Sequence, residues 1–230
     1  MIRRFLAALI LLWAGAASAA DPVLRYEAAD GAYLAAAEMI RGGTVGFCDH
    51  YFFMDEVARV VEESGLRATL AWCVFGMGEG TEVGRGLPET VDFVQRWQGA
   101  ADGRIKTVLG PHSPYACPAD FLVTVAARSA ELNVGLHLHL AEFRDQLEAS
   151  LARHGKTPVR YLADLGVLDR PTIAAHCIWI TPEDIALLAE KRTHVVQCPN
   201  THMKLGMGVT PVPELLAAGV DVALGTDGPG

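Results

Sequence analysis

The sequence lacks the features of several protein classes. Its net charge is −8, with 19 basic against 27 acidic residues, and it contains no long run of like charges. A nucleic-acid backbone requires a basic patch on its partner, so nucleic acid is not an expected partner. Charged residues make up only 20% of the chain and apolar residues 51%, which excludes intrinsic disorder. We expect a small-molecule substrate, and assembly into a homo-oligomer is compatible with this composition.

Closely spaced cysteine pairs are also missing. None of the five cysteines forms a C-x-x-C pair, and their odd number leaves one unpaired in any disulfide scheme. They are Cys48, Cys73, Cys117, Cys177 and Cys198. We therefore expect buried, reduced thiols.

Long apolar segments are absent as well. No stretch approaches the roughly 18 consecutive apolar residues of a membrane helix, so we expect no integral membrane segment. At the N-terminus, Arg3 and Arg4 precede an apolar run, and Ala17-Ser18-Ala19 is typical of a signal-peptidase site. Residues 1–20 are therefore interpreted as a signal-peptide-like leader, which implies an exported or periplasmic protein. The alternative is an incidental apolar N-terminus from a mis-set start, which implies a cytoplasmic one.

The stretch G-L-H-L-H-L-A-E, residues 135–142, is the centre of the predicted site. Its alternation places His137 and His139 on one face of a strand and three leucines on the other. Glu142 follows where the strand ends, so a nitrogen ligand and a proton-carrying acid can reach one pocket. His137 lies two residues deeper than His139, and core packing is the favoured interpretation for it.

Repeated strand-then-helix patterns indicate the fold. Seven nearly continuous apolar strands are expected, six of them followed by a helix, which favours a parallel sheet. The strands end in polar residues: Asp49 and His50, His112, His139 and Glu142, His176, His202, and Asp227. An open sheet would spread these along an edge, whereas a barrel gathers them at one mouth. We therefore predict an α/β fold of the (β/α)8 TIM type over residues 21–230.

Several ordered motifs support a family resemblance. They are H-L-H-L-A-E, A-A-H-C, C-P-N-T-H-M-K-L-G and V-A-L-G-T-D-G, together with G-P-H-S-P-Y at residues 110–115 and A-A-E-M-I-R-G-G-T at residues 36–44. In these motifs the chain resembles the amidohydrolase superfamily, in the branch of 5-methylthioadenosine/S-adenosylhomocysteine deaminases and related chlorohydrolases.

The resemblance implies a metal-dependent hydrolytic deaminase of an amino-purine nucleoside or similar amino-heterocycle. It implies Zn²⁺, or another divalent metal such as Fe²⁺, with His139 and Asp227 as metal ligands. Asp227 would also act as the base toward the metal-bound water, and Glu142 would protonate the ring nitrogen of the substrate. His176 would orient or polarise the reacting centre, and His112 would contact the substrate.

The chain departs from the family pattern in two places. The resemblance implies a first strand with an H-x-H metal motif and a closing helix after the last strand, and neither is found in residues 1–230. We therefore expect an incomplete barrel, and the alternative to an active deaminase is a truncated, inactive fragment. A chlorohydrolase or another amidohydrolase activity is a further alternative. The tripeptide N-T-H at residues 200–202 replaces the usual serine-asparagine pair, which affects the expected substrate contacts.

Overall fold

The computed structural model describes residues 22–76 and 86–228, so the leader predicted at residues 1–20 lies outside the described residues. The chain divides into two compact units, one ending at Gly110 and the other beginning at Pro111. Within the described ranges, no helix combines the length and the apolar character that crossing a membrane requires. None of the five cysteines forms a disulfide in the structure. Four of them are buried, as expected, whereas Cys48 is exposed, so the expectation of burial was wrong for this residue.

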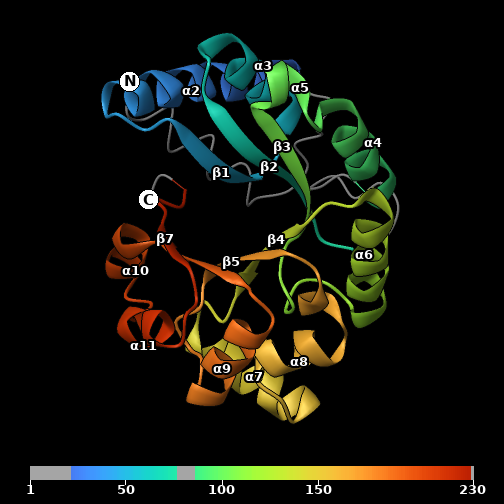
Figure 1. Ribbon diagram of the computed structural model, residues 1–230, viewed down its shortest axis with the longest axis vertical. Coiled ribbons are helices and arrows are strands. Elements are labelled where there is room, and N and C mark those ends of the chain that lie inside the picture. The colour runs from blue at the N-terminus through green and yellow to red at the C-terminus, as the bar shows by residue number, and fades with distance from the viewer. Residues whose placement is uncertain (1–21, 77–85, 229–230) are drawn as a thin grey trace. The chain divides into compact units, whose positions relative to one another are not determined.

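Among the residues that the structure describes, the first unit has three strands and four helices (Figure 1). These are α2 (Pro22–Arg41), β1 (Gly46–Tyr51), α3 (Met54–Ser64), β2 (Arg67–Val74), α4 (Leu87–Trp97), α5 (Ala100–Gly103) and β3 (Ile105–Pro111). Strands β1 and β2 pair in parallel. Helices α2 and α3 pack together through a buried cluster of Ala36, Val60 and Leu66, to which Phe47 of β1 adds. This cluster forms part of the core of the unit.

The end of β3 requires a glycine. A Cβ atom at Gly110 would lie 2.6 Å from the carbonyl oxygen of Trp72 and 2.9 Å from the ring of His50. The Trp72 backbone and the His50 side chain approach Gly110 so closely that a residue with a Cβ atom would not fit here. Nε2 of His50 lies 3.1 Å from the Gly110 carbonyl oxygen, to which it donates a hydrogen bond.

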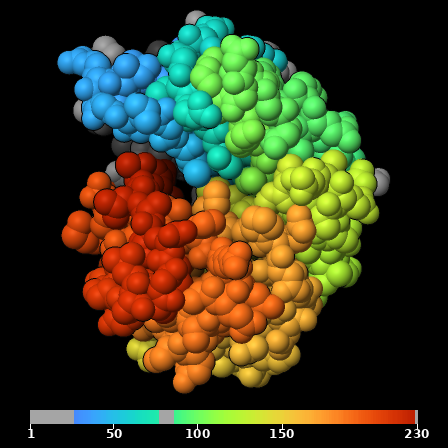
Figure 2. All heavy atoms as spheres, in the orientation of Figure 1, coloured from blue at the N-terminus to red at the C-terminus, as the bar shows by residue number. Residues whose placement is uncertain are grey.

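In the second unit, the described residues form four strands that pair in parallel in chain order. They are β4 (Leu136–Leu140), β5 (Thr172–His176), β6 (His194–Gln197) and β7 (Val222–Leu224). The helical segments are α6 (Ala119–Leu132), α7 (Arg144–His154), α8 (Pro158–Asp164), η1 (Val167–Asp169), α9 (Pro182–Glu190), α10 (Pro199–Leu205) and α11 (Val212–Ala217). Helices α9 to α11 contribute to the orange and red surface of this unit in Figure 2.

Strand β4 follows the predicted alternation. Leu136, Leu138 and Leu140 are fully buried in the core of the second unit. His137 and His139 therefore project from the opposite face. This alternation positions the candidate site, because the chain leaves the strand directly after Leu140 and reaches Glu142 two residues later.

Helix ends in the second unit follow local sequence signals. Thr181 begins α9 by accepting a hydrogen bond from the Asp184 N–H at 3.2 Å, and the Asp184 carboxylate accepts one from the Thr181 N–H at 3.0 Å. This reciprocal pair satisfies two N–H groups that the helix leaves open. Gly155 ends α7 in the left-handed region at φ 66°, which glycine adopts without strain.

Two local expectations were wrong. Strand β1 continues to Tyr51, so Asp49 and His50 lie inside the strand and do not follow it. Residues 199–205 form the short helix α10, where only a polar connection after the strand was expected, so His202 is helical. Pro199 stands in the first turn of α10, where its missing N–H costs nothing.

Candidate active site

Three imidazoles from the ends of three successive strands stack in the second unit. The ring of His139 lies between those of His112 and His176, with ring centroids 4.5 Å and 5.4 Å away. His112 directly follows β3, His139 belongs to β4, and His176 ends β5. The convergence expected from the strand-end pattern is therefore present within this unit.

His139 has a defined tautomer. Its backbone N–H and its Nδ1 atom each lie 2.9 Å from the carbonyl oxygen of His112. Because a carbonyl only accepts hydrogen bonds, Nδ1 carries the proton and Nε2 carries the lone pair. A histidine that ligates a metal has this arrangement, with its other nitrogen donating to a carbonyl. The donor chemistry of His139 therefore fits a metal ion.

Glu142 lies just beyond β4, in a partly buried setting. The Tyr115 hydroxyl donates a hydrogen bond to its Oε2 atom at 3.1 Å, and Oε1 lies 4.0 Å from Nε2 of His176. The Glu142 backbone N–H donates to Oε1 of Gln146 at 3.1 Å, which fixes the turn into α7.

The surroundings of Glu142 favour its protonated form. Burial is the main cause that raises the pKa of Glu142, and the charge of Asp227 adds to it. His139 and the hydrogen bonds from Tyr115 and Gln146 oppose this rise without cancelling it. A carboxyl group with a raised pKa holds its proton closer to neutral pH, as a general acid requires.

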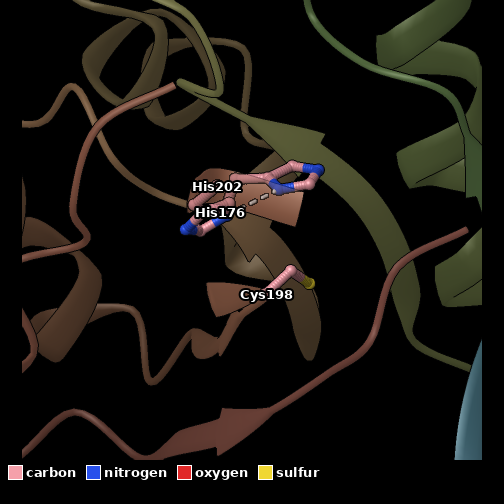
Figure 3. A group of neighbouring side chains, drawn as sticks. All are labelled: His176, Cys198 and His202. Atoms are coloured by element: carbon pink, nitrogen blue, oxygen red, sulfur yellow. Dashed lines mark hydrogen bonds between the residues drawn. The ribbon is translucent and has the colours of Figure 1, made fainter. Parts of the chain in front are cut away.

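His176 is a neutral imidazole. Burial, followed by the neighbouring His139 and His202, lowers its pKa to about 3. Nδ1 of His176 lies 3.2 Å from Nε2 of His202, and Figure 3 marks this hydrogen bond. Among the described residues, Nδ1 of His202 has no hydrogen-bond partner.

These contacts assign the protons of the pair. A proton on Nδ1 of His202 would be a buried donor without an acceptor, which is unfavourable. We therefore place the proton of His202 on Nε2, from which it is donated to Nδ1 of His176. His176 then carries its own proton on Nε2, the atom that faces Glu142.

Asp227 follows β7 and is exposed. Its Oδ1 atom accepts a hydrogen bond from the Gly228 N–H at 2.7 Å. Its negative charge raises the pKa values of Glu142, Cys198 and His202. The Asp227 carboxylate is thus within electrostatic reach of the same cluster.

Backbone strain gathers at these positions. Ala141, His176 and Asp227 have positive φ angles of 50°, 77° and 60° although none is a glycine. Such conformations cost on the order of 1–3 kcal/mol each and persist where the surrounding structure enforces them. Hydrogen bonds from Ile178 N–H and Trp179 N–H to the Ala141 carbonyl, both 3.0 Å, help to hold the end of β4.

The remaining candidates lie elsewhere. His137 is buried, and burial lowers its pKa to about 3, in keeping with a neutral core residue. Asp49 belongs to the first unit, where burial raises its pKa to about 6. Tyr115 was not predicted as a site residue, although its place three residues after His112 in G-P-H-S-P-Y was a usable signal. Cys198 was also missed, because an isolated cysteine before a proline gives no functional signal.

Comparison with known proteins establishes the family. The sequence profile of the amidohydrolase family matches residues 11–230, nearly the whole chain. The chain belongs to the amidohydrolase family. This match begins within the segment that was interpreted as a leader.

Named relatives of this amidohydrolase include deaminases. The chain is 50% identical over 198 residues to a 5-methylthioadenosine/S-adenosylhomocysteine deaminase of Moorella thermoacetica, covering 86% of this chain and 46% of that protein. Identity to the corresponding enzyme of Pelotomaculum thermopropionicum is 46%, covering 86% of this chain and 45% of that one. The chain therefore spans about half the length of the curated relatives that it matches.

A solved structure supports the fold. An adenosine deaminase from Xanthomonas campestris with bound zinc matches with a TM-score of 0.81 and 34% identity, covering 89% of this chain and 46% of that one. An atrazine chlorohydrolase from Arthrobacter aurescens TC1 shares the fold at a TM-score of 0.73 and 22% identity, covering 85% and 47%. The fold is an incomplete TIM-type α/β barrel, as predicted, and the predicted superfamily is confirmed.

Proposed function

We propose that this amidohydrolase chain contributes the acid and half of the metal site to a hydrolytic deaminase of amino-purine nucleosides, of the 5-methylthioadenosine/S-adenosylhomocysteine type. The main support for this proposal is the cluster of Glu142 with His139 and His176. In this cluster the Glu142 carboxyl group, whose pKa is raised, lies 4.0 Å from Nε2 of His176. Two groups that donate protons thus face one position. Displacing an amino group from a purine ring requires proton donation to the ring nitrogen and to the departing ammonia.

Each residue has a role in this proposal. Glu142, held by Tyr115, donates its proton to the ring nitrogen. His176 stays neutral and directs its Nε2 proton to the reacting centre, because His202 occupies its other nitrogen. His112 stacks on His139 and contacts the substrate, and Asp227 accepts the proton of the attacking water.

The residues present also fit a metal ion. His139 offers a nitrogen lone pair and Asp227 a carboxylate, which suit Zn²⁺ or Fe²⁺. When bound, zinc lowers the pKa of its water to about 7 and so supplies hydroxide at neutral pH. Catalytic zinc sites use three protein ligands. We therefore expect activity only where a further ligand set, such as the H-x-H motif implied by the resemblance, accompanies these residues.

Ammonia release tests the proposal. The longest product of the gene that contains these residues would be loaded with zinc and incubated with 5-methylthioadenosine, S-adenosylhomocysteine and, separately, atrazine. We expect ammonia and the corresponding inosine product from the nucleosides and no chloride from atrazine. Stoichiometric zinc without ammonia from any amino-purine would refute the proposal, and chloride release would replace it with dehalogenation.

A further inference from the structure

His176, Cys198 and His202 form a compact cluster, in which the proposed deamination gives a role to His176 and its hydrogen-bond partner His202 but none to Cys198. His176 ends β5, Cys198 precedes α10, and His202 lies within α10. All three are at least 96% buried, with exposed fractions of 1%, 4% and 2%. Their ligand atoms lie within 4.8 Å of one another. Figure 3 shows the two tilted rings joined by their hydrogen bond, with the Cys198 side chain in the same region.

The spacing of the nitrogens matches that of a metal site. Zn–N bonds of about 2.05 Å at tetrahedral angles place two nitrogens about 3.3 Å apart. Nδ1 of His176 and Nε2 of His202 are separated by 3.2 Å. With a Zn–S bond of about 2.3 Å, the sulfur belongs about 3.6 Å from each nitrogen. The three ligand atoms lie within 4.8 Å of one another, so the Cys198 side chain would move toward the nitrogens when a metal binds.

The cluster is also held in place and prepared for ligation. Thr210 donates its hydroxyl hydrogen to the His176 carbonyl oxygen at 2.7 Å, and the Met207 N–H donates to the His202 carbonyl oxygen at 2.9 Å. A Cβ atom at Gly225 would lie 3.0 Å from Sγ of Cys198, so the glycine leaves room for the sulfur.

We propose that His176, Cys198 and His202 bind a divalent cation of borderline softness, Zn²⁺ above all, at a site that adjoins that of His139 and Asp227. Two imidazoles and a thiolate form a donor set that favours zinc over magnesium or calcium. The His176 ring separates the two sites, because Nδ1 faces the new site and Nε2 faces Glu142. A cation held by Nδ1 of His176 and Nε2 of His202 keeps the proton of His176 on Nε2 and moves the proton of His202 from Nε2 to Nδ1. The proposal does not depend on deaminase activity.

Cobalt substitution distinguishes the two sites. Co²⁺ bound to a thiolate gives an intense charge-transfer band in the near ultraviolet, whereas a site of histidine and carboxylate gives none. We would titrate Co²⁺ into the reduced 230-residue chain, using a reductant without thiols. The expected result is a thiolate band that saturates at one Co²⁺ per chain and disappears when one equivalent of Zn²⁺ is added.

Variants locate the site. C198S should abolish the band, and H202N should weaken Co²⁺ affinity at least tenfold. Matched thiol controls are C177S, also buried, and C48S, the exposed cysteine. Both should retain the band, as should H139N, in which the site of the proposed deaminase is impaired.

Three outcomes would overturn the proposal: no thiolate band in the wild-type chain, a band that survives C198S, or a band lost equally in C177S. Circular dichroism of each variant establishes that it is folded. If C198S does not fold, the affinity of H202N for Co²⁺ decides, and unchanged affinity in that variant refutes the site. Loss of ammonia release with an intact thiolate band would count against the deaminase alone.

Discussion

Replacement of Glu142 by glutamine removes the acidic proton of this side chain but keeps its size and shape. An amide in position 142 still accepts the Tyr115 hydrogen bond and fills the same volume, but it does not act as a proton donor of comparable acidity. General acid catalysis contributes about 10²–10⁴ in rate, which corresponds to about 3–5 kcal/mol of activation free energy. We expect E142Q to lower kcat for deamination by that factor while binding zinc normally.

The same substitution should increase stability at neutral pH. Because burial raises the pKa of folded Glu142 above its unfolded value, the folded protein loses stability as pH rises through that interval. The neutral amide has no such loss. The thermal midpoint of metal-free E142Q should therefore exceed that of the wild type, by more at pH 8 than at pH 5.

Calorimetry and steady-state kinetics on one preparation test both parts. The matched control is E148Q, which makes the same chemical change at an exposed position of α7 whose carboxylate pairs with Arg144. E148Q should leave kcat unchanged. Its thermal midpoint, compared with that of the wild type, should not rise from pH 5 to pH 8 as that of E142Q does. A kcat within threefold of wild type in E142Q, or a stability difference that shrinks with rising pH, would refute the role assigned to Glu142.

Three further predictions concern ligation, packing and charge. In a C198S background, which removes the thiolate of the other proposed site, H139N should lower zinc affinity by more than the roughly 10–100-fold that loss of an outer-shell partner costs. Isothermal titration measures this, and unchanged affinity would contradict His139 as a ligand. L138A should lower the free energy of unfolding, measured by urea denaturation, by about 2–5 kcal/mol because the Leu138 side chain is fully buried. V123A should lower it far less because Val123 is 45% exposed, and equal losses would contradict the assigned core. His176, with a pKa of about 3, should remain neutral from pH 5 to pH 8; an imidazole titration in this range by NMR would contradict its assigned state.

Much of the site followed from local pattern. The alternation of β4 placed His139 and the leucines on their observed faces, and the polar residues after apolar strands identified His112, Glu142 and His176. Parallel strands bring their carboxyl ends together, so contacts between residues far apart in the chain could be expected from strand order alone.

Other features depended on tertiary contacts. The Tyr115 hydroxyl donates a hydrogen bond to Glu142 although 27 residues of chain separate them. Helix α10 is seven residues long, too short to be stable alone, and its polar start resembles a turn. Its formation brings His202 against His176, a pairing that no periodicity in the sequence indicates.

The left-handed backbone at Ala141, His176 and Asp227 lowers the stability of the folded protein, but it also sets the shape of the pocket. Selection for a more heat-resistant protein would favour glycine at these three places, yet two of them carry the side chains of the proposed chemistry. Ala141 contributes no functional group. It is therefore the position where a directed-evolution experiment could relax the fold without removing a reacting atom.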